Sequence, residues 1–200
     1  MGGSTREVAD AVARALRHGG LDVEVRQPRE VGDVEGYDSV ILGSPILYGG
    51  PRRELRAFIR DHRAALGHRP TAFFLTCMEL TDVPDTKHPG LPLVVDPLLA
   101  RPPATPGKLT MFERTHLPSD FIDRLLAGAP EIRPISIVIF AGKLDYATLD
   151  PVSRLAMRMI WRIYQRAPEG DRRNWDTIHT WAENLLPQLP VSAVSTPVQF

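Results

Sequence analysis

Three short, continuous apolar segments constrain the fold of this chain more than any other feature. They are residues 39–43, 71–77 and 135–140. Apolar runs of this length are typical of strands that are buried on both faces, as in parallel sheets. Amphipathic segments with helical spacing separate them, so the pattern predicts strands that alternate with helices. We therefore expect an α/β domain with an open parallel sheet and helices on both of its faces.

The remaining elements are expected from periodicity. The predicted helices are 4–18, 51–66, 118–126, 151–166 and 175–186. In the first of them Val8, Val12 and Leu16 recur at helical spacing, and Ser4 or Thr5 can cap its free amide groups. Residues 21–26 alternate apolar and polar side chains, which predicts a half-exposed strand at the edge of the sheet.

The length of 200 residues fits one domain, and a hydrophobic content of 43% is ordinary for a globular protein. We expect a single domain over residues 1–187 and a loose tail over 188–200, where prolines are frequent. Residues 78–108 contain seven prolines and little periodicity. That segment predicts a long loop excursion.

Charge and composition exclude several classes of function. The chain has 24 basic and 24 acidic residues, so its formal net charge is +0 and nucleic-acid binding has no global electrostatic support. The single cysteine, Cys77, excludes an internal disulfide and indicates a reducing, cytoplasmic compartment. The histidines are scattered without metal-ligand spacing, so no metal site is expected. No apolar run is long enough to span a bilayer.

Three segments next to the expected strands are candidate binding loops, because ligands bind at the carboxyl ends of parallel strands. Residues 2–6 place glycines and hydroxyl groups at a helix N-terminus, which is an arrangement that binds phosphate. Residues 43–50 follow a buried strand and carry Tyr48, whose ring can lie beside a flat heterocycle. Residues 76–79 follow the next buried strand.

Each of these loops also has a simpler interpretation. The first is then an ordinary helix N-terminus, and the second is a plain turn with Tyr48 packed on the surface. In the third, Cys77 is more often a small buried residue than a nucleophile. No histidine has a readable spacing to this cysteine, so thiol catalysis is not expected.

Four segments resemble the flavodoxin family through their order and spacing. They are GSTREVADAVARAL (3–16), YDSVILGSPILYGG (37–50), PTAFFLTC (70–77) and SIVIFAGKLDY (136–146). The chain is more similar to the branch that contains menaquinone-dependent protoporphyrinogen IX dehydrogenase and related flavodoxin-domain proteins. Residues 167–185 resemble the ending of that branch. The resemblance implies a flavodoxin-like fold that binds FMN.

The same resemblance implies which residues hold the cofactor. The phosphate would be held by Gly3, Ser4, Thr5 and Arg6. The first ring-binding loop would be Ser44, Pro45, Ile46, Leu47, Tyr48 and Gly49, and the second would be Thr76, Cys77, Met78 and Glu79. No catalytic side chain is implied, because the cofactor carries the chemistry.

The function that follows is an FMN-dependent oxidoreductase with protoporphyrinogen or a quinone as its redox partner. A flavodoxin-like electron carrier that serves a partner protein is an alternative. The balanced charge argues mildly against a carrier, since carriers usually rely on a strongly acidic surface. A flavin-free interaction module that kept only the fold is a further alternative.

One departure from the family concerns the first strand. In the family an apolar strand precedes the phosphate loop and lies in the middle of the sheet, whereas here the loop follows Met1 directly. We therefore expect either a natural start further upstream or a fold that tolerates the missing strand. In the second case the sheet would pair 21–26 with 39–43, or it would leave a gap with unpaired backbone groups.

The predicted helix 151–166 carries arginines at every fourth position and no acidic residue. They are Arg154, Arg158, Arg162 and Arg166. The favoured interpretation is a helix that packs its wide apolar face against the sheet and the C-terminal helix, with the arginines in solvent. The alternative is a basic amphipathic helix in peripheral contact with an anionic membrane surface.

Overall fold

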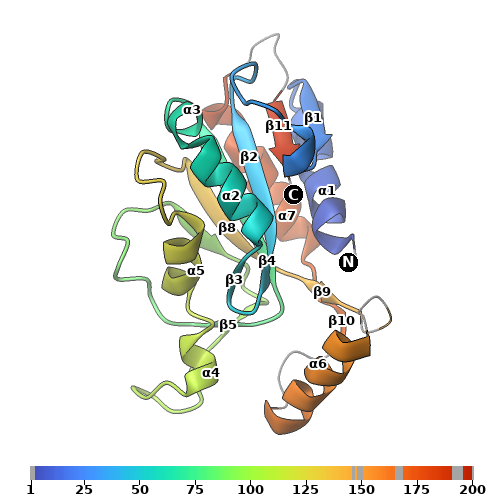
Figure 1. Cartoon of the computed structure of the whole chain (residues 1–200), viewed down its shortest axis with the longest axis vertical. Coiled ribbons are helices and arrows are strands. Elements are labelled where there is room, and N and C mark those ends of the chain that lie inside the picture. Colours follow the sequence, from blue (N-terminus) through green and yellow to red (C-terminus); the bar gives the residue numbers. More distant parts are fainter. Residues whose placement is uncertain (1–2, 146, 148–150, 165–168, 191–195, 200) are drawn as a thin grey trace.

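A central sheet with helices on both faces forms the body of the protein (Figure 1). The structure is a computed structural model, and it describes residues 3–145, 147, 151–164, 169–190 and 196–199. The main strands are β1 (Val23–Arg26), β2 (Val40–Leu47), β4 (Thr71–Cys77), β6 (Leu93–Val95), β8 (Ser136–Ala141) and β11 (Thr196–Gln199). They lie in the order β1-β11-β2-β4-β8-β6, and all neighbours are parallel. The expected α/β architecture is therefore confirmed.

The helices follow the predicted order along the chain. They are α1 (Ser4–His18), α2 (Arg53–Asp61), α3 (Arg63–Gly67), α4 (Met111–Arg114), α5 (Pro118–Leu125), α6 (Pro151–Tyr164) and α7 (Trp175–Leu185). Short 3-10 helices are η1 (Pro28–Glu30) and η3 (Leu186–Gln188). The helix expected over 51–66 is divided at His62, which ends α2 and precedes α3. Element α4 was not expected from the sequence.

Successive residues of the central strands face opposite sides of the sheet, and different helices cover the two sides. One core contains Ile41, Ala72, Phe74, Val138 and Phe140 together with residues of α1 and α7. The other contains Leu42, Phe73, Leu75, Ile137 and Ile139 together with residues of α2 and α5. Burial on both faces explains why these strands are apolar without alternation.

The C-terminal strand β11 lies between β1 and β2. It pairs with β1 over its whole length, from Val23↔Thr196 to Arg26↔Gln199, and with β2 at Ile41↔Val198 and Leu42↔Gln199. Both expected alternatives for this position, a direct pairing of 21–26 with 39–43 and an open gap, are therefore wrong. The expectation of a loose tail is also wrong for Thr196–Gln199, because these residues supply backbone partners to both neighbours.

The proline-rich excursion over 78–108 contains short strands rather than loop alone. Strand β6 pairs with β8 and forms an edge of the sheet. Strands β5 (Leu80–Thr81) and β7 (Ala100–Arg101) pair with each other. Such short strands carry too few residues for a periodic pattern, so the sequence did not predict them.

Helix α6 differs most from its expected position. Figure 1 shows it at the lower right, away from the sheet and from α7. Val152, Leu155 and Met159 are exposed, so the expected packing of its apolar face against the core is wrong for these side chains. Arg166 lies outside the described residues.

Candidate functional site

Helix α1 begins next to the carboxyl ends of the parallel strands. Gly3 occupies the N-cap position, and no side chain in the described part of the chain caps it, so the expected cap from Ser4 or Thr5 is wrong. Uncapped amide groups at the positive end of a helix dipole favour an anion. Arg6 is exposed and lies 3.8 Å from Asp10, so its side chain follows the helix surface.

A buried hydrogen bond joins this helix end to the end of β4. Thr5 Oγ1 and Thr76 Oγ1 are 3.2 Å apart. Strand register places Pro45 of β2 directly beside Thr76. The structure therefore brings together the first candidate segment, the start of the second and the start of the third.

Strand β2 continues beyond the sheet into a hairpin with β3 (Gly50–Pro51). Tyr48 and Gly49 form its turn with φ of 51° and 78°, the left-handed values that a type I′ turn requires. Arg124 Nη1 of α5 donates to the Gly49 carbonyl at 2.6 Å, which ties the hairpin to the body of the protein. Tyr48 is 90% exposed at this turn, so the segment is the plain surface turn of the simpler interpretation, although the ring is not packed down on the surface. This ring is free to cover a ligand.

Ser44 shapes the base of this hairpin. Its hydroxyl donates to the Pro45 carbonyl at 2.9 Å and accepts from the Arg52 amide at 3.0 Å. The residue is buried. We therefore assign Ser44 to the closure of the loop, while Ile46 and Leu47 extend toward the exposed turn.

The third candidate segment, residues 76–79, is largely enclosed. Thr76, Cys77 and Glu79 are buried, and Met78 is partly buried. The Gly142 amide donates to the Cys77 carbonyl at 2.7 Å, which joins the ends of β4 and β8. The segment therefore presents Met78 and backbone atoms, rather than the Cys77 and Glu79 side chains, to the outside.

Burial raises the pKa of Cys77 to about 12. We expect this thiol to react with a disulfide reagent such as DTNB at pH 8 on the order of a thousandfold more slowly in the folded protein than in denaturant, because only the thiolate attacks. Stopped-flow absorbance with and without guanidinium measures the ratio. Equal rates in the two conditions would contradict the buried position and reopen thiol chemistry.

Arg173 lies against the first turn of α1, and the sequence analysis did not predict it as a site residue. Its Nη1 atom donates to Glu7 Oε2 at 2.7 Å and to the Ser4 carbonyl at 3.4 Å, and its Nε atom donates to Asp171 Oδ1 at 2.8 Å. The Asp171 carboxylate raises the pKa of Arg173, and Arg173 in turn lowers the pKa of Asp171. The Arg173 guanidinium at this helix end is therefore paired with two carboxylates, Glu7 and Asp171, and brings no net positive charge to it. No spacing in the sequence predicts this contact.

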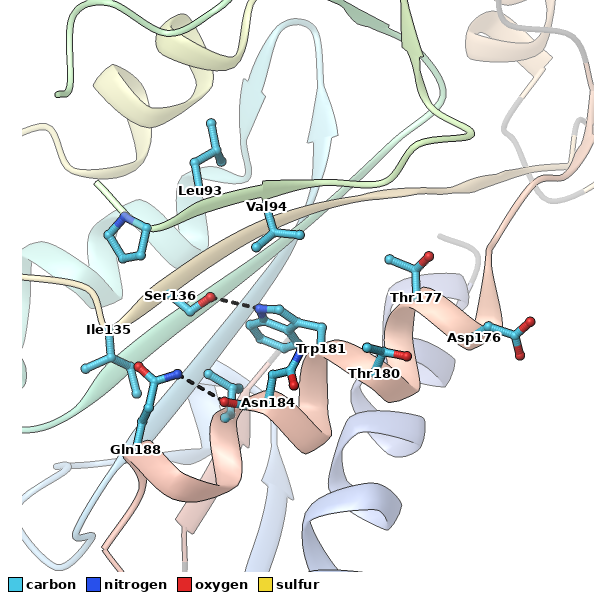
Figure 2. A pocket seen from close by; sticks show the side chains of 12 residues that line it. Leu93, Val94, Ile135, Ser136, Asp176, Thr177, Thr180, Trp181, Asn184 and Gln188 are labelled. Atoms are coloured by element: carbon cyan, nitrogen blue, oxygen red, sulfur yellow. Dashed lines mark hydrogen bonds between the residues drawn. The ribbon is translucent and has the colours of Figure 1, made fainter. Parts of the chain in front are cut away.

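The described part of the chain also contains a hollow away from these segments. A groove of about 500 Å³ runs between α7 and the edge strand β6, and Figure 2 shows Val94, Thr180 and Trp181 along it. Trp181 Nε1 donates to Ser136 Oγ at 2.9 Å at its floor. Ser136 begins β8, so the groove lies away from the carboxyl ends of the strands. It is therefore separate from the segments that meet at Thr5 and Thr76.

The described residues contain neither a cluster of metal ligands nor a helix that could span a membrane. No group of three or more His, Cys, Asp or Glu side chains gathers there in a way that could hold a metal ion. In the same residues, no helix combines the length and apolar character needed to cross a bilayer.

Comparison with known proteins identifies relatives of the chain. The family model described as "Flavodoxin domain" matches residues 1–171. Protoporphyrinogen IX dehydrogenase [quinone] of Escherichia coli strain K12 is 31% identical over 74 residues, which cover 36% of this chain and 41% of that protein, and the enzyme of Escherichia coli O157:H7 gives the same values. The chain thus spans about two fifths of the length of these relatives.

A relative with a different name covers more of the chain. The imidazole glycerol phosphate synthase subunit HisH of Rhodospirillum rubrum is 30% identical over 169 residues, which cover 77% of this chain and 75% of that protein. No solved structure is significantly similar to the chain. The family model spans most of the chain and agrees with the parallel sheet, so it decides the family.

Proposed function

The chain belongs to the flavodoxin domain family, and from this premise we propose that it binds FMN at the carboxyl ends of its strands and acts as an oxidoreductase. The observation that carries the proposal is the Thr5–Thr76 hydrogen bond. It holds the uncapped end of α1 beside the strand ends from which the Tyr48 hairpin projects. The proposed phosphate site and the exposed Tyr48 ring thus lie at the same end of the sheet, where the strands terminate.

The residues present fit the two ends of FMN. The first turn of α1 offers amide groups and the Ser4 hydroxyl to a phosphate. Arg173, which is paired with Glu7 and Asp171, fixes the backbone of this turn through the Ser4 carbonyl. Tyr48 offers an exposed ring to the flavin. FMN supplies the electron-transfer chemistry when it is bound, while the protein binds it, orients it and limits the access of water.

The redox partner is proposed by analogy with the relatives. The name of the Escherichia coli proteins states protoporphyrinogen IX and a quinone, so these two molecules are the first substrates to test. An electron carrier is the alternative, and turnover separates the two functions. An enzyme oxidises protoporphyrinogen repeatedly with a quinone as acceptor, whereas a carrier exchanges electrons once per bound flavin until a partner protein is added.

The proposed FMN site predicts that a negative charge at position 4 discriminates between two flavins. Ser4→Asp places a carboxylate where the phosphate is expected, so the Kd for FMN should rise at least about tenfold through charge repulsion. The Kd for riboflavin, which lacks the phosphate, should stay nearly unchanged. An acidic residue in a first helical turn is favourable for the helix, so the variant should fold. Fluorescence titration with each flavin measures both constants.

Arg14→Gln is the matched control, because it changes the net charge by one on an exposed turn of the same helix.

At the other end of the flavin, Tyr48→Ala should raise both Kd values roughly fivefold, the scale of about 1 kcal/mol for an aromatic contact. Tyr48→Phe keeps the ring and should leave both Kd values unchanged. If the unmodified protein binds neither flavin, the proposal fails. If Ser4→Asp raised the Kd for both flavins equally, the proposed binding of the phosphate at the N-terminus of α1 would be wrong.

A further inference from the structure

Helix α6 carries an exposed surface that the FMN site does not use. The chain leaves the end of β8 through β9 (Lys143–Leu144) and returns through β10 (Gly170–Asp171), and these two strands pair antiparallel as Leu144↔Gly170 and Lys143↔Asp171. Helix α6 lies between them in the sequence. Figure 1 shows it beyond this ribbon, at the end of the sheet where the β2–β3 hairpin also projects.

The described side chains of α6 form a mixed apolar and cationic face. Val152, Leu155 and Met159 are 79%, 62% and 56% exposed, and their spacing of three and four residues places them on one stripe. Arg158 and Arg162, both exposed, follow Leu155 and Met159 by three residues and therefore border that stripe. Isolated apolar residues on a surface are ordinary, but a stripe flanked by arginines is not.

No negative charge within the helix balances these arginines. Residues 151–164 contain no Asp or Glu, although the whole chain has a formal net charge of +0. Arg154, in the first turn of the helix, donates to the Ala147 carbonyl at 3.2 Å. The positive charge at the far end is therefore carried by Arg158 and Arg162.

Further exposed apolar residues lie at the same end of the sheet. Tyr48 tips the β2–β3 hairpin, Met111 begins α4 and is 86% exposed, and Leu98 follows the end of β6 and is 67% exposed. Figure 1 shows α4, the hairpin and α6 together at the lower end of the molecule. The exposed apolar residues of these segments and of α6 therefore lie at the same end of the sheet.

We propose that α6 docks the protein on an anionic lipid surface, with Leu155 and Met159 entering the interface and Arg158 and Arg162 contacting the lipid headgroups. Charge complementarity favours an anionic lipid surface as the partner, because helix α6 carries exposed cations and no acidic residue of its own. Docking turns the carboxyl ends of the strands toward the bilayer, where apolar redox molecules dissolve. The binding itself requires no flavin.

Co-sedimentation with vesicles tests the proposal, using the full chain with and without FMN. We expect binding to vesicles of equimolar phosphatidylcholine and phosphatidylglycerol that is at least about tenfold stronger than binding to phosphatidylcholine alone, and that weakens as salt rises because the charges are screened. Arg158→Gln with Arg162→Gln should reduce the binding to anionic vesicles about tenfold or more. Leu155→Ser with Met159→Ser should reduce the binding that persists at high salt.

Arg56→Gln with Arg60→Gln is the matched control, since it removes two exposed positive charges from α2 on another part of the surface. This pair should leave vesicle binding nearly unchanged. Circular dichroism and thermal unfolding of each variant verify that it is folded, as expected for substitutions on exposed positions.

Three results would overturn the proposal. They are equal and negligible binding to both kinds of vesicle at low salt, equal losses in the α6 and α2 arginine pairs, and a concentration-dependent dimer that disappears in Leu155→Ser with Met159→Ser. The last result would make a second copy the partner of α6. Vesicle binding by a protein that fails to bind FMN would refute the proposed function and leave the docking surface intact.

Discussion

Gly43→Ala is expected to lower the free energy of unfolding by about 2–3 kcal/mol, within the range for overpacked cores. A methyl group at this position would overlap the ring of Phe74, its register partner on β4. The ring cannot move easily, because it is fully buried with Phe140 and Trp181 at centroid distances of 6.3 and 6.4 Å. Urea unfolding followed by tryptophan fluorescence measures the change.

Gly36→Ala is the matched control, since an added methyl group there meets no atom within 4 Å and the residue does not need a positive φ. It should change stability by less than about 0.5 kcal/mol. A double-mutant cycle locates the clash. Phe74→Leu makes room for the methyl group, so the double variant should be more stable than the sum of the two single losses predicts. A Gly43→Ala protein as stable as the control would show that Phe74 does not fill this space.

The central sheet could be predicted because its strands are continuous apolar runs, and such runs indicate burial on both faces of a sheet. The segment 71–77 is apolar at nearly every position, and strand β4 has these bounds in the structure. Helix α1 also has its predicted bounds of Ser4–His18, since its apolar residues recur at helical spacing and two glycines follow it. In both cases local pattern and burial agree.

Strand β11 could not be predicted for the opposite reason. It is four residues long and contains Pro197, which lacks a backbone donor and argues against an inner strand. Its place in the sheet depends on backbone groups of β1 and β2 from the other end of the chain. No local sequence pattern indicates that β1 and β2 need a strand between them. The exposure of Val152, Leu155 and Met159 on α6 was predicted wrongly, because the composition of this helix suits both a buried face and an exposed one.

The candidate site was predictable only where it follows strands. The end of α1, the Tyr48 hairpin and Thr76 converge because parallel strands end on the same side of a sheet. Arg173 reaches this place for a different reason, since α7 packs beside α1 and carries the preceding loop with it. The sequence also could not show that Ser44 uses its hydroxyl within its own loop.

Removal of residues 196–200 is expected to lower the free energy of unfolding by about 3 kcal/mol or more. The deletion leaves inward-facing backbone groups of β1 and β2 without partners, and each buried unpaired group costs about 1–3 kcal/mol. It also uncovers the flank of Ile41 and Leu42, which are fully buried in the complete chain. Thermal unfolding gives the size of the loss. Val198→Pro is a smaller change with the same direction, because it removes one donor at the residue that pairs with both Val25 and Ile41.

Hydrogen exchange distinguishes a local loss of pairing from general unfolding. Amides of β1 and β2 that pair with β11 should lose protection in the shortened chain, while those paired between β4 and β8 should keep theirs. Pro197→Ala, which restores a donor within the strand, should not destabilise the protein. The core that contains α1 also includes Val23 of β1 and Ile41 of β2, so the shortened chain should bind FMN more weakly through a less fixed α1 N-terminus. Unchanged protection of β1 and β2 would show that Thr196–Gln199 does not hold these strands together.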